Sequence, residues 1–439
     1  MASEETARNR FRELFPPLLL LFSLLDGARL FEGKHILGIP FNVNLSDVGM
    51  ITCLVLYVFL YREEIVASLS GSSMVLYLAI VFLVVTFAGG FISNPYWMIS
   101  FKYWIKIYVL FGVLVVLFRT SRISHTTIYL FCGLFLFLNL VGILECFYRE
   151  SQSMQDLLVI FRTPESLAGS SSVSSIFVNQ NIYGVLNGLF LITLVSIYFN
   201  YPHMINKAAL IAISILCAVG IFLSTSRNAL FTTIFGGLFL ALPVLKMGRG
   251  LKTLFTIVII IIVLFIVSVK IMPNYAQRLG RVFPVITKLE NHQAIDHKDF
   301  RIELSKESRV SIWKTGLEKA MDRPVLGWGN CMAFFHLKPI TKHDHLHNAF
   351  IEILYSNGIV GFTLFMALLA LWLAKLRSVW CWPPVAATLF MSMFETFFVI
   401  APWVVFTAWL VAFTTKDLAD NGDILSVKSK QTSQDSSQR

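Results

Sequence analysis

One histidine stands where the chain could do acid–base chemistry. His347 is predicted to lie at the first turn of a helix, directly before Asn348, and six of the nine histidines fall between Lys270 and this point. The positive end of a helix dipole disfavours imidazolium, so the ring of His347 should be neutral and able to accept a proton near pH 7. A general base needs that property. On spacing alone, the same residue could instead cap the helix or contact a lipid headgroup.

The histidines before the helix also fit a metal site. His343, His345 and His347 alternate, so they would share one face of an extended segment. No separate carboxylate cluster completes a site, although a row of imidazoles alone could bind a metal ion. We therefore predict no bound metal and no other cofactor.

Two sets of cations could bind an anion. Arg227 lies in Ser224-Thr225-Ser226-Arg227-Asn228, a polar break between two apolar runs, and a guanidinium offers a fork of donors that suits phosphate. Lys102 and Lys106 are four residues apart, on one face of a predicted helix. Each of these cations could instead reach out to lipid headgroups.

Two further segments could position a substrate. Asn179 and Asn181 precede an apolar run, where they could cap a helix or present amides to a sugar. Residues 308–321 have the spacing of an amphipathic helix that lies in the membrane interface with Trp313 at headgroup depth, or of a plain surface helix. Pro324 should end it, and Gly327-Trp328-Gly329 should form a turn. Glu145 and Glu395 lie near the ends of apolar runs, and the sequence gives neither a role.

The elements that hold these residues are predicted to be membrane helices. The chain of 439 residues is 56% hydrophobic and only 14% charged, whereas soluble proteins carry about 25% charged residues. A helix needs about 20 apolar residues to cross the hydrocarbon. This criterion predicts an all-α polytopic membrane protein of about 12 spans, at 14–31, 46–61, 74–92, 101–118, 127–147, 182–199, 207–224, 229–245, 252–271, 348–374, 379–398 and 400–415.

The basic residues predict the orientation. With the N-terminus inside, 16 of the 36 lysines and arginines fall in inner segments and 7 in short outer ones, and the other 13 lie from Lys270 to Lys342. Cations prefer the inner side. We therefore predict nine spans in 1–271, a large outer loop with short helices at 272–346, three spans in 347–415 and a disordered inner tail at 416–439. The net charge of +10 does not indicate nucleic-acid binding, because the cations sit between spans.

Four motifs together resemble the O-antigen ligase and O-antigen polymerase superfamily of bacterial membrane glycosyltransferases. Each motif is weak alone, but their order before and after the large loop is fairly specific. They cover about residues 177–365: Phe177-Val-Asn-Gln-Asn, Ser224-Thr-Ser-Arg227, Arg309-x-x-x-Trp313 followed by Pro324-x-x-Gly327-x-Gly329, and His347-Asn348 with Glu352, Gly358 and Gly361.

The resemblance implies a fold, a reaction and a set of residues. The fold would be related to the C-type glycosyltransferases. The enzyme would move a glycan from undecaprenyl pyrophosphate to an acceptor hydroxyl at the periplasmic face of the inner membrane, without a metal and with inversion. His347 matches the family's essential histidine and Arg227 its essential arginine. Arg29 is a looser match for an arginine after the first span. Arg309, Lys102 and Lys106 would help to hold pyrophosphate, and Asn179, Asn181, Asn348 and Trp313 would position substrates.

Three activities fit the superfamily. A ligase transfers to lipid A-core, a polymerase transfers to another lipid-linked repeat, and protein O-oligosaccharyltransferases form a third branch. We favour a ligase, because one type of polymerase carries Arg-x10-Gly repeats in two outer loops, whereas here the residue eleven positions after Arg309 is Ala320. The expected partners are the undecaprenyl-pyrophosphate-linked glycan, lipid A-core and membrane lipids. A secondary transporter is the alternative from another class. Transporters tend to show inverted repeats and mid-membrane ionisable groups, whereas this sequence shows no repeat and its ionisable groups cluster at one surface.

Overall fold

The computed structural model describes the chain in thirteen ranges: 2–24, 29–36, 39–70, 73–91, 96–121, 123–148, 151–159, 173–177, 179–246, 309–330, 332–341, 345–395 and 401–415. The predicted span 252–271, the tail 416–439 and the first half of the predicted outer loop lie outside these ranges. His343 lies outside them as well.

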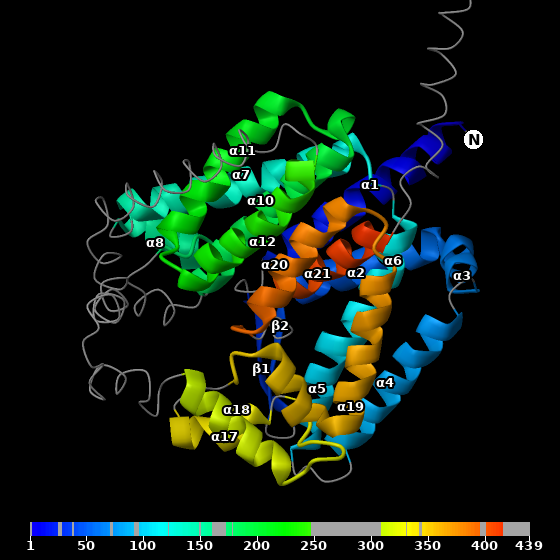
Figure 1. Ribbon diagram of the computed structural model, residues 1–439, viewed down its shortest axis with the longest axis vertical. Coiled ribbons are helices and arrows are strands. Elements are labelled where there is room, and N and C mark those ends of the chain that lie inside the picture. The colour runs from blue at the N-terminus through cyan, green and yellow to red at the C-terminus, as the bar shows by residue number, and fades with distance from the viewer. Residues whose placement is uncertain are drawn as a thin grey trace, which may run out of the picture.

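The described residues form helices and one β-hairpin (Figure 1). The hairpin pairs β1 (Arg29–Ile36) with β2 (Ile39–Asn44) in antiparallel register, and it is the one departure from an all-α fold in the described ranges. The helices are α1 (Ala2–Leu24), α2 (Leu45–Leu60), α3 (Arg62–Ser70), α4 (Ser73–Phe91), α5 (Trp97–Trp104), α6 (Leu110–Thr120), α7 (His125–Tyr148), α8 (Gln152–Val159), α10 (Gln180–Asn200), α11 (Lys207–Leu223), α12 (Arg227–Lys246), α17 (Arg309–Met321), α18 (Ala333–Thr341), α19 (Ala349–Ala374), α20 (Trp382–Ser392) and α21 (Ala401–Thr415).

Six described helical segments are long and apolar enough to cross a membrane. They are Met74–Phe91, Ser100–Thr120, His125–Tyr148, Gln180–Asn200, Arg227–Val244 and Ala349–Ala374, and Asp47–Leu60, Lys207–Leu223 and Pro402–Thr415 are shorter apolar helices. The chain is therefore a helical membrane protein, but the predicted count of 12 spans is not confirmed. The first predicted span, 14–31, overran its helix: α1 ends at Leu24 and β1 begins at Arg29.

The helices gather in two groups (Figure 1). The first group holds α7, α10, α11 and α12, the second holds α4, α5 and α19, and α1, α20 and α21 lie between them. α10 packs against α11, α12 and α20, and α11 packs against α7. α4 packs along α19, while α21 packs against α6 and α1. Inside the first group, Asn139 Nδ2 donates to Asn187 Oδ1 at 2.8 Å and Tyr183 Oη donates to Asn139 Oδ1 at 2.8 Å. Polar side chains in an apolar interior need such partners, so this buried network fixes how α7 and α10 meet.

α19 is broken at Gly358, whose φ is +62°. The loop after α17 fills the break. The N–H groups of Ile359 and Val360 donate to the carbonyls of Pro324 and Val325 at 2.7 and 3.3 Å. Before the break, the carbonyls of Tyr355 and Ser356 accept from the N–H groups of Trp328 and Gly329 at 3.0 and 2.8 Å. Non-helical backbone is tolerated at membrane depth only where such groups are satisfied.

The glycines of this loop follow from that close approach. Gly327 has φ +72°, and a Cβ there would lie 2.5 Å from the backbone of Ser356 and Asn357. Residues 324–329, hereafter the clamp loop, therefore tie α17 to the middle of α19. The close approach explains why glycine stands at positions 327 and 358, where a Cβ would lie within 2.6 Å of backbone atoms of the other segment.

Candidate functional site

The backbone before α19 holds His347 in an unusual conformation. His347 has φ +50°, a left-handed geometry that costs non-glycine residues roughly 1–3 kcal/mol. Its two neighbours fix it there. Leu346 is fully buried and its N–H donates to Glu352 Oε2 at 3.0 Å. Asn348 caps α19, since its Oδ1 accepts from the N–H groups of Phe350 and Ile351, both at 3.0 Å.

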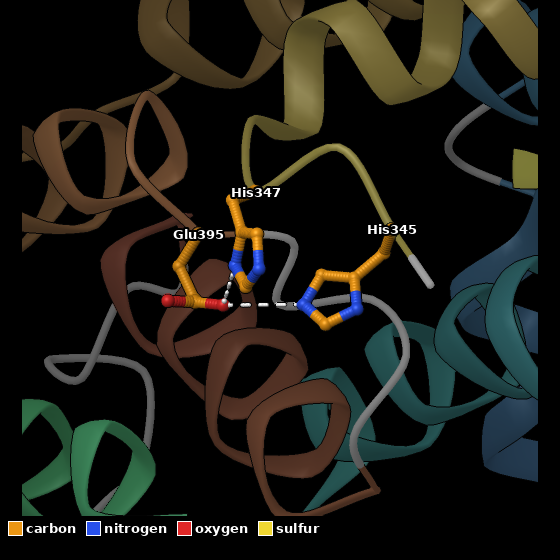
Figure 2. A group of neighbouring side chains, drawn as sticks. All are labelled: His345, His347 and Glu395. Atoms are coloured by element: carbon orange, nitrogen blue, oxygen red, sulfur yellow. Dashed lines mark hydrogen bonds and ion pairs between the residues drawn. The ribbon is translucent and has the colours of Figure 1, made fainter. Parts of the chain in front are cut away.

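The side chain of His347 points at a carboxylate from another part of the chain. His347 Nδ1 lies 2.9 Å from Glu395 Oε1, and His345 Nε2 lies 3.5 Å from the same oxygen. Figure 2 shows the two imidazole rings converging on Glu395, which follows α20. Asn348 holds the two segments together, because its Nδ2 donates to the carbonyl of Met393 at 3.0 Å.

The second oxygen of Glu395 faces cationic and amide groups. Arg309 Nη2 lies 3.5 Å from Glu395 Oε2, and Arg309 Nη1 donates to Asn228 Oδ1 at 3.0 Å. Asn228 Nδ2 in turn donates to Glu395 Oε2 at 3.3 Å. Thus the N-termini of α17 and α12 and the end of α20 meet at one buried carboxylate, which is 6% exposed.

Arg227 stands beside this group at the first residue of α12. Its side chain is exposed, and its charge acts on Arg309. The preceding polar break is built around hydrogen bonds: Ser226 Oγ donates to Asn181 Oδ1 at 2.8 Å and accepts from the N–H of Ala229 at 3.2 Å. Asn181 therefore positions the segment that carries Arg227, a role that the sequence did not reveal.

Burial and charge set the protonation of the site. Burial lowers the pKa of His347 below its ordinary value, and the hydrogen bond to Glu395 raises it by less. Burial acts to raise the pKa of Glu395, but its hydrogen bonds to His345 and His347 and the charge of Arg309 outweigh burial and lower the pKa to about 2. Near pH 7 the pair is thus a carboxylate and a neutral imidazole. The carboxylate keeps a proton on Nδ1 of His347, which puts the basic lone pair on Nε2.

The same three side chains have the composition of a metal site. Ligand atoms of His345, His347 and Glu395 all lie within 4.8 Å of one another, and two imidazoles with a carboxylate are donors that zinc accepts. Two observations favour a hydrogen-bonded group instead. The carboxylate and the ring of His347 are in direct hydrogen-bond contact, and Arg309 already supplies a positive charge to Glu395.

The remaining predicted residues take several places. Asn179 caps α10, because its Oδ1 accepts from the N–H of Asn181 at 2.8 Å. Trp313 lies on α17, where its ring packs 6.2 Å from that of Phe394 and its Nε1 is buried without a hydrogen bond in the described ranges. Lys102 lies on α5 and Lys106 in the π-helical turn Ile105–Val109 that follows. Arg29 begins β1, and its side chain lies outside the described part of the chain.

Sequence reasoning missed Glu395 and Asn228 and set His345 aside. Glu395 lies 48 residues after His347, in a segment where a carboxylate near a helix end could equally face water. The available signal was a carboxylate at the end of an apolar run. Asn228 stood next to Arg227 in the polar break, but nothing in the spacing paired it with Arg309. Glu145, the other unassigned carboxylate, is buried and accepts from the N–H groups of Ser174 and Ser175 at 3.1 and 2.7 Å.

Comparison with known families places the site in context. Residues 212–366 match a family model described as O-Antigen ligase. The match includes Arg227, Arg309 and His347, whereas Glu395 lies beyond its end. No curated protein matches the chain. Over residues 212–366 the match agrees with the resemblance that the motifs gave, and it supports a place in the O-antigen ligase superfamily of membrane glycosyltransferase-like enzymes.

Proposed function

We propose that this protein is an O-antigen ligase. It transfers a glycan from undecaprenyl pyrophosphate to the lipid A-core of lipopolysaccharide, at the periplasmic face of the inner membrane. The observation that carries the proposal is the pairing of His347 with Glu395 beside Arg309, two of the three lying inside the family-matched residues. A polarised imidazole next to cations is what transfer from a pyrophosphate carrier requires.

His347 acts as the general base. Its Nε2 takes the proton from the acceptor hydroxyl while that oxygen attacks the anomeric carbon of the glycan. The bond from the anomeric carbon to the carrier phosphate breaks, and its electron pair leaves with undecaprenyl pyrophosphate. The ionised Glu395 stabilises the imidazolium that forms, since it accepts from Nδ1. General bases contribute roughly 10²–10⁴-fold in rate.

The arginines hold the leaving group. Arg227 is exposed and its charge acts on Arg309, and its guanidinium can bind two phosphate oxygens at once. Arg309 is more buried and supplies charge beside Glu395, while Lys102, Lys106 and Arg29 are candidates for donor binding through the family resemblance. Positioned charge usually contributes more to such catalysis than any other single effect. Asn348, Asn181, Asn179 and Trp313 keep these groups and the substrates in place.

A polymerase of the same superfamily is the alternative within the same chemistry. It would use the same base and the same cations, so the site geometry favours neither acceptor. The absence of Arg-x10-Gly motifs from the sequence is the feature that favours a ligase.

The phenotype of a deletion strain separates the two activities. Without the ligase, lipid A-core should carry no long glycan while polymerised glycan accumulates on its carrier. Plasmid-borne wild type and His203→Ala, a matched control on an exposed histidine, should restore the glycolipid, and His347→Ala should not. Core that bears a single repeat in the deletion strain would assign the protein as a polymerase.

A further inference from the structure

One cavity of the described structure is lined by neither His347 nor Glu395. It has a volume of about 580 Å³, is partly open, and is lined by residues of α3, α4, α6, α19, α20 and α21. Its walls are mostly aliphatic and aromatic. One end is lined by Ala349 and Phe350, the first residues of α19, and by Ser392 at the end of α20. This end therefore lies directly behind the segment that carries His347.

The opposite end of the cavity is cationic. Arg119, Lys375 and Arg377 line it, and no carboxylate is among its described lining residues. Arg119 is in the last turn of α6, and Lys375 follows the last residue of α19. The N–H of Arg377 donates to the carbonyl of Thr414 at 3.3 Å, and its Nε donates to the carbonyl of Thr415 at 3.4 Å. The end of α21 thus fixes one of the three cations.

A membrane span along α19 would put these two ends on opposite sides of the membrane. α19 is long and apolar enough to span it, and the cavity follows this helix from Ala349 to Ala374. A ligand that matches the walls has a long hydrocarbon chain and one anionic head. Basic pockets between membrane helices bind the head groups of anionic lipids, with phosphate held by guanidinium and ammonium groups.

We propose that this cavity binds an anionic glycerophospholipid from the leaflet opposite to His347. Its phosphate lies among Arg119, Lys375 and Arg377, and one acyl chain runs along α19 toward Phe350. The chain then packs behind the first turn of α19, so the lipid supports the helix start that holds His347.

The polyprenyl carrier is a poorer match for the same space. In the proposed reaction its pyrophosphate lies at Arg227 and Arg309, and neither residue lines the cavity. A carrier chain that entered from the His347 end would bring hydrocarbon, and no anion, to the three cations. Basic groups at the end of a pocket attract an anionic head group, so the position of the cations favours a lipid that enters from the other side.

The chain offers a variant that blocks the cavity with little risk to the fold. Gly112 lines the cavity, and a Cβ at this residue would meet no atom within 4 Å. Gly112→Leu should therefore place its side chain where the acyl chain runs. Gly133→Leu is the matched control, because Gly133 is also without a neighbour within 4 Å but lies on α7, away from the cavity.

The test measures lipid binding to the purified full-length protein. Protein in phosphatidylcholine nanodiscs is titrated with fluorescent phosphatidylglycerol, and retained lipid is identified by native mass spectrometry. Gly112→Leu should abolish binding, and Gly133→Leu should keep it. Arg119→Gln with Lys375→Gln should weaken binding roughly 30-fold, since each basic side chain beside an anionic lipid contributes about a factor of five.

Three outcomes would overturn the proposal. The first is phosphatidylglycerol binding that Gly112→Leu and the charge variant leave unchanged. The second is competition by inorganic phosphate alone, which would make the ligand a free anion. The third is a labelled polyprenyl pyrophosphate that Gly112→Leu displaces while phosphatidylglycerol never binds. None of these readouts needs turnover, so they leave the proposed ligase reaction to be judged by the deletion strain.

Discussion

Replacing Glu395 by glutamine should separate the role of the carboxylate from that of the histidine. Glu395 Oε1 lies 2.9 Å from Nδ1 of His347, and the carboxylate stays ionised because its pKa is lowered to about 2. A hydrogen bond to a charged group contributes about 1.5–3 kcal/mol. The imidazolium gains that stabilisation only when the base has taken the proton, so Glu395→Gln should lower turnover by about 10- to 150-fold.

The pH profile of the same variant has a defined direction. The reaction needs neutral His347, so the rate falls as pH drops through its pKa. Burial lowers that pKa below the ordinary 6.5, and the hydrogen bond to Glu395 raises it in part. Glu395→Gln removes the raising contribution. The acid limb should therefore move to still lower pH while the maximum rate falls.

The assay uses purified protein, lipid-linked glycan and lipid A-core, with donor binding measured separately. Donor binding should not weaken in Glu395→Gln, because the change removes a negative charge beside Arg309. Glu318→Gln is the control, since Glu318 is an exposed carboxylate that pairs with Lys314 on α17. Full turnover with an unmoved acid limb in Glu395→Gln would refute the assignment of the pair.

Further measurements test other parts of the proposal. His347→Ala should lower turnover by roughly 10²-fold or more with donor binding nearly unchanged, and its acid limb should vanish; full activity in a correctly inserted variant would remove the general base. Arg227→Lys should lose most activity because a point charge replaces a two-pronged grip, and near wild-type turnover would reduce Arg227 to a headgroup contact. Activity should survive excess EDTA; if zinc or manganese restored a lost activity, His345, His347 and Glu395 would be metal ligands. In a cysteine-free background, single cysteines at Lys298 and Lys338 should react with an impermeant thiol reagent in spheroplasts, whereas one at Gln434 should not; labelling at Gln434 alone would invert the topology.

Local pattern was enough to predict the parts of the site that depend on nearby residues. Spacing gave the amphipathic helix at 308–321, and the structure has it at Arg309–Met321. Asn348 was expected beside the first turn of a helix that it now caps. In each case the information lies within one or two turns, where periodicity and capping chemistry act.

Contacts between distant segments could not be predicted in the same way. Glu395 contacts His347 because the residues after α20 lie beside the start of α19. The spacing of residues in the sequence does not indicate this contact. The hairpin at Arg29–Asn44 was missed because the first predicted span, 14–31, already took in its first three residues. The break at Gly358 looked like a single glycine in an apolar helix, since what makes it a break is backbone from residues 324–329.

That break has a consequence for how the protein is made. α19 must enter the bilayer with four backbone groups that its own helix does not pair: the carbonyls of Tyr355 and Ser356 and the N–H groups of Ile359 and Val360. The clamp loop forms a hydrogen bond with each of them. Each would cost several kcal/mol if it met lipid unpaired. The clamp loop is synthesised before α19, so it is available to form these hydrogen bonds when α19 enters the membrane. We therefore expect membrane insertion of α19 and docking of α17 to occur as one step of biogenesis. A chain that lacks residues 324–329 should then fail at insertion and be degraded, before any question of catalysis arises.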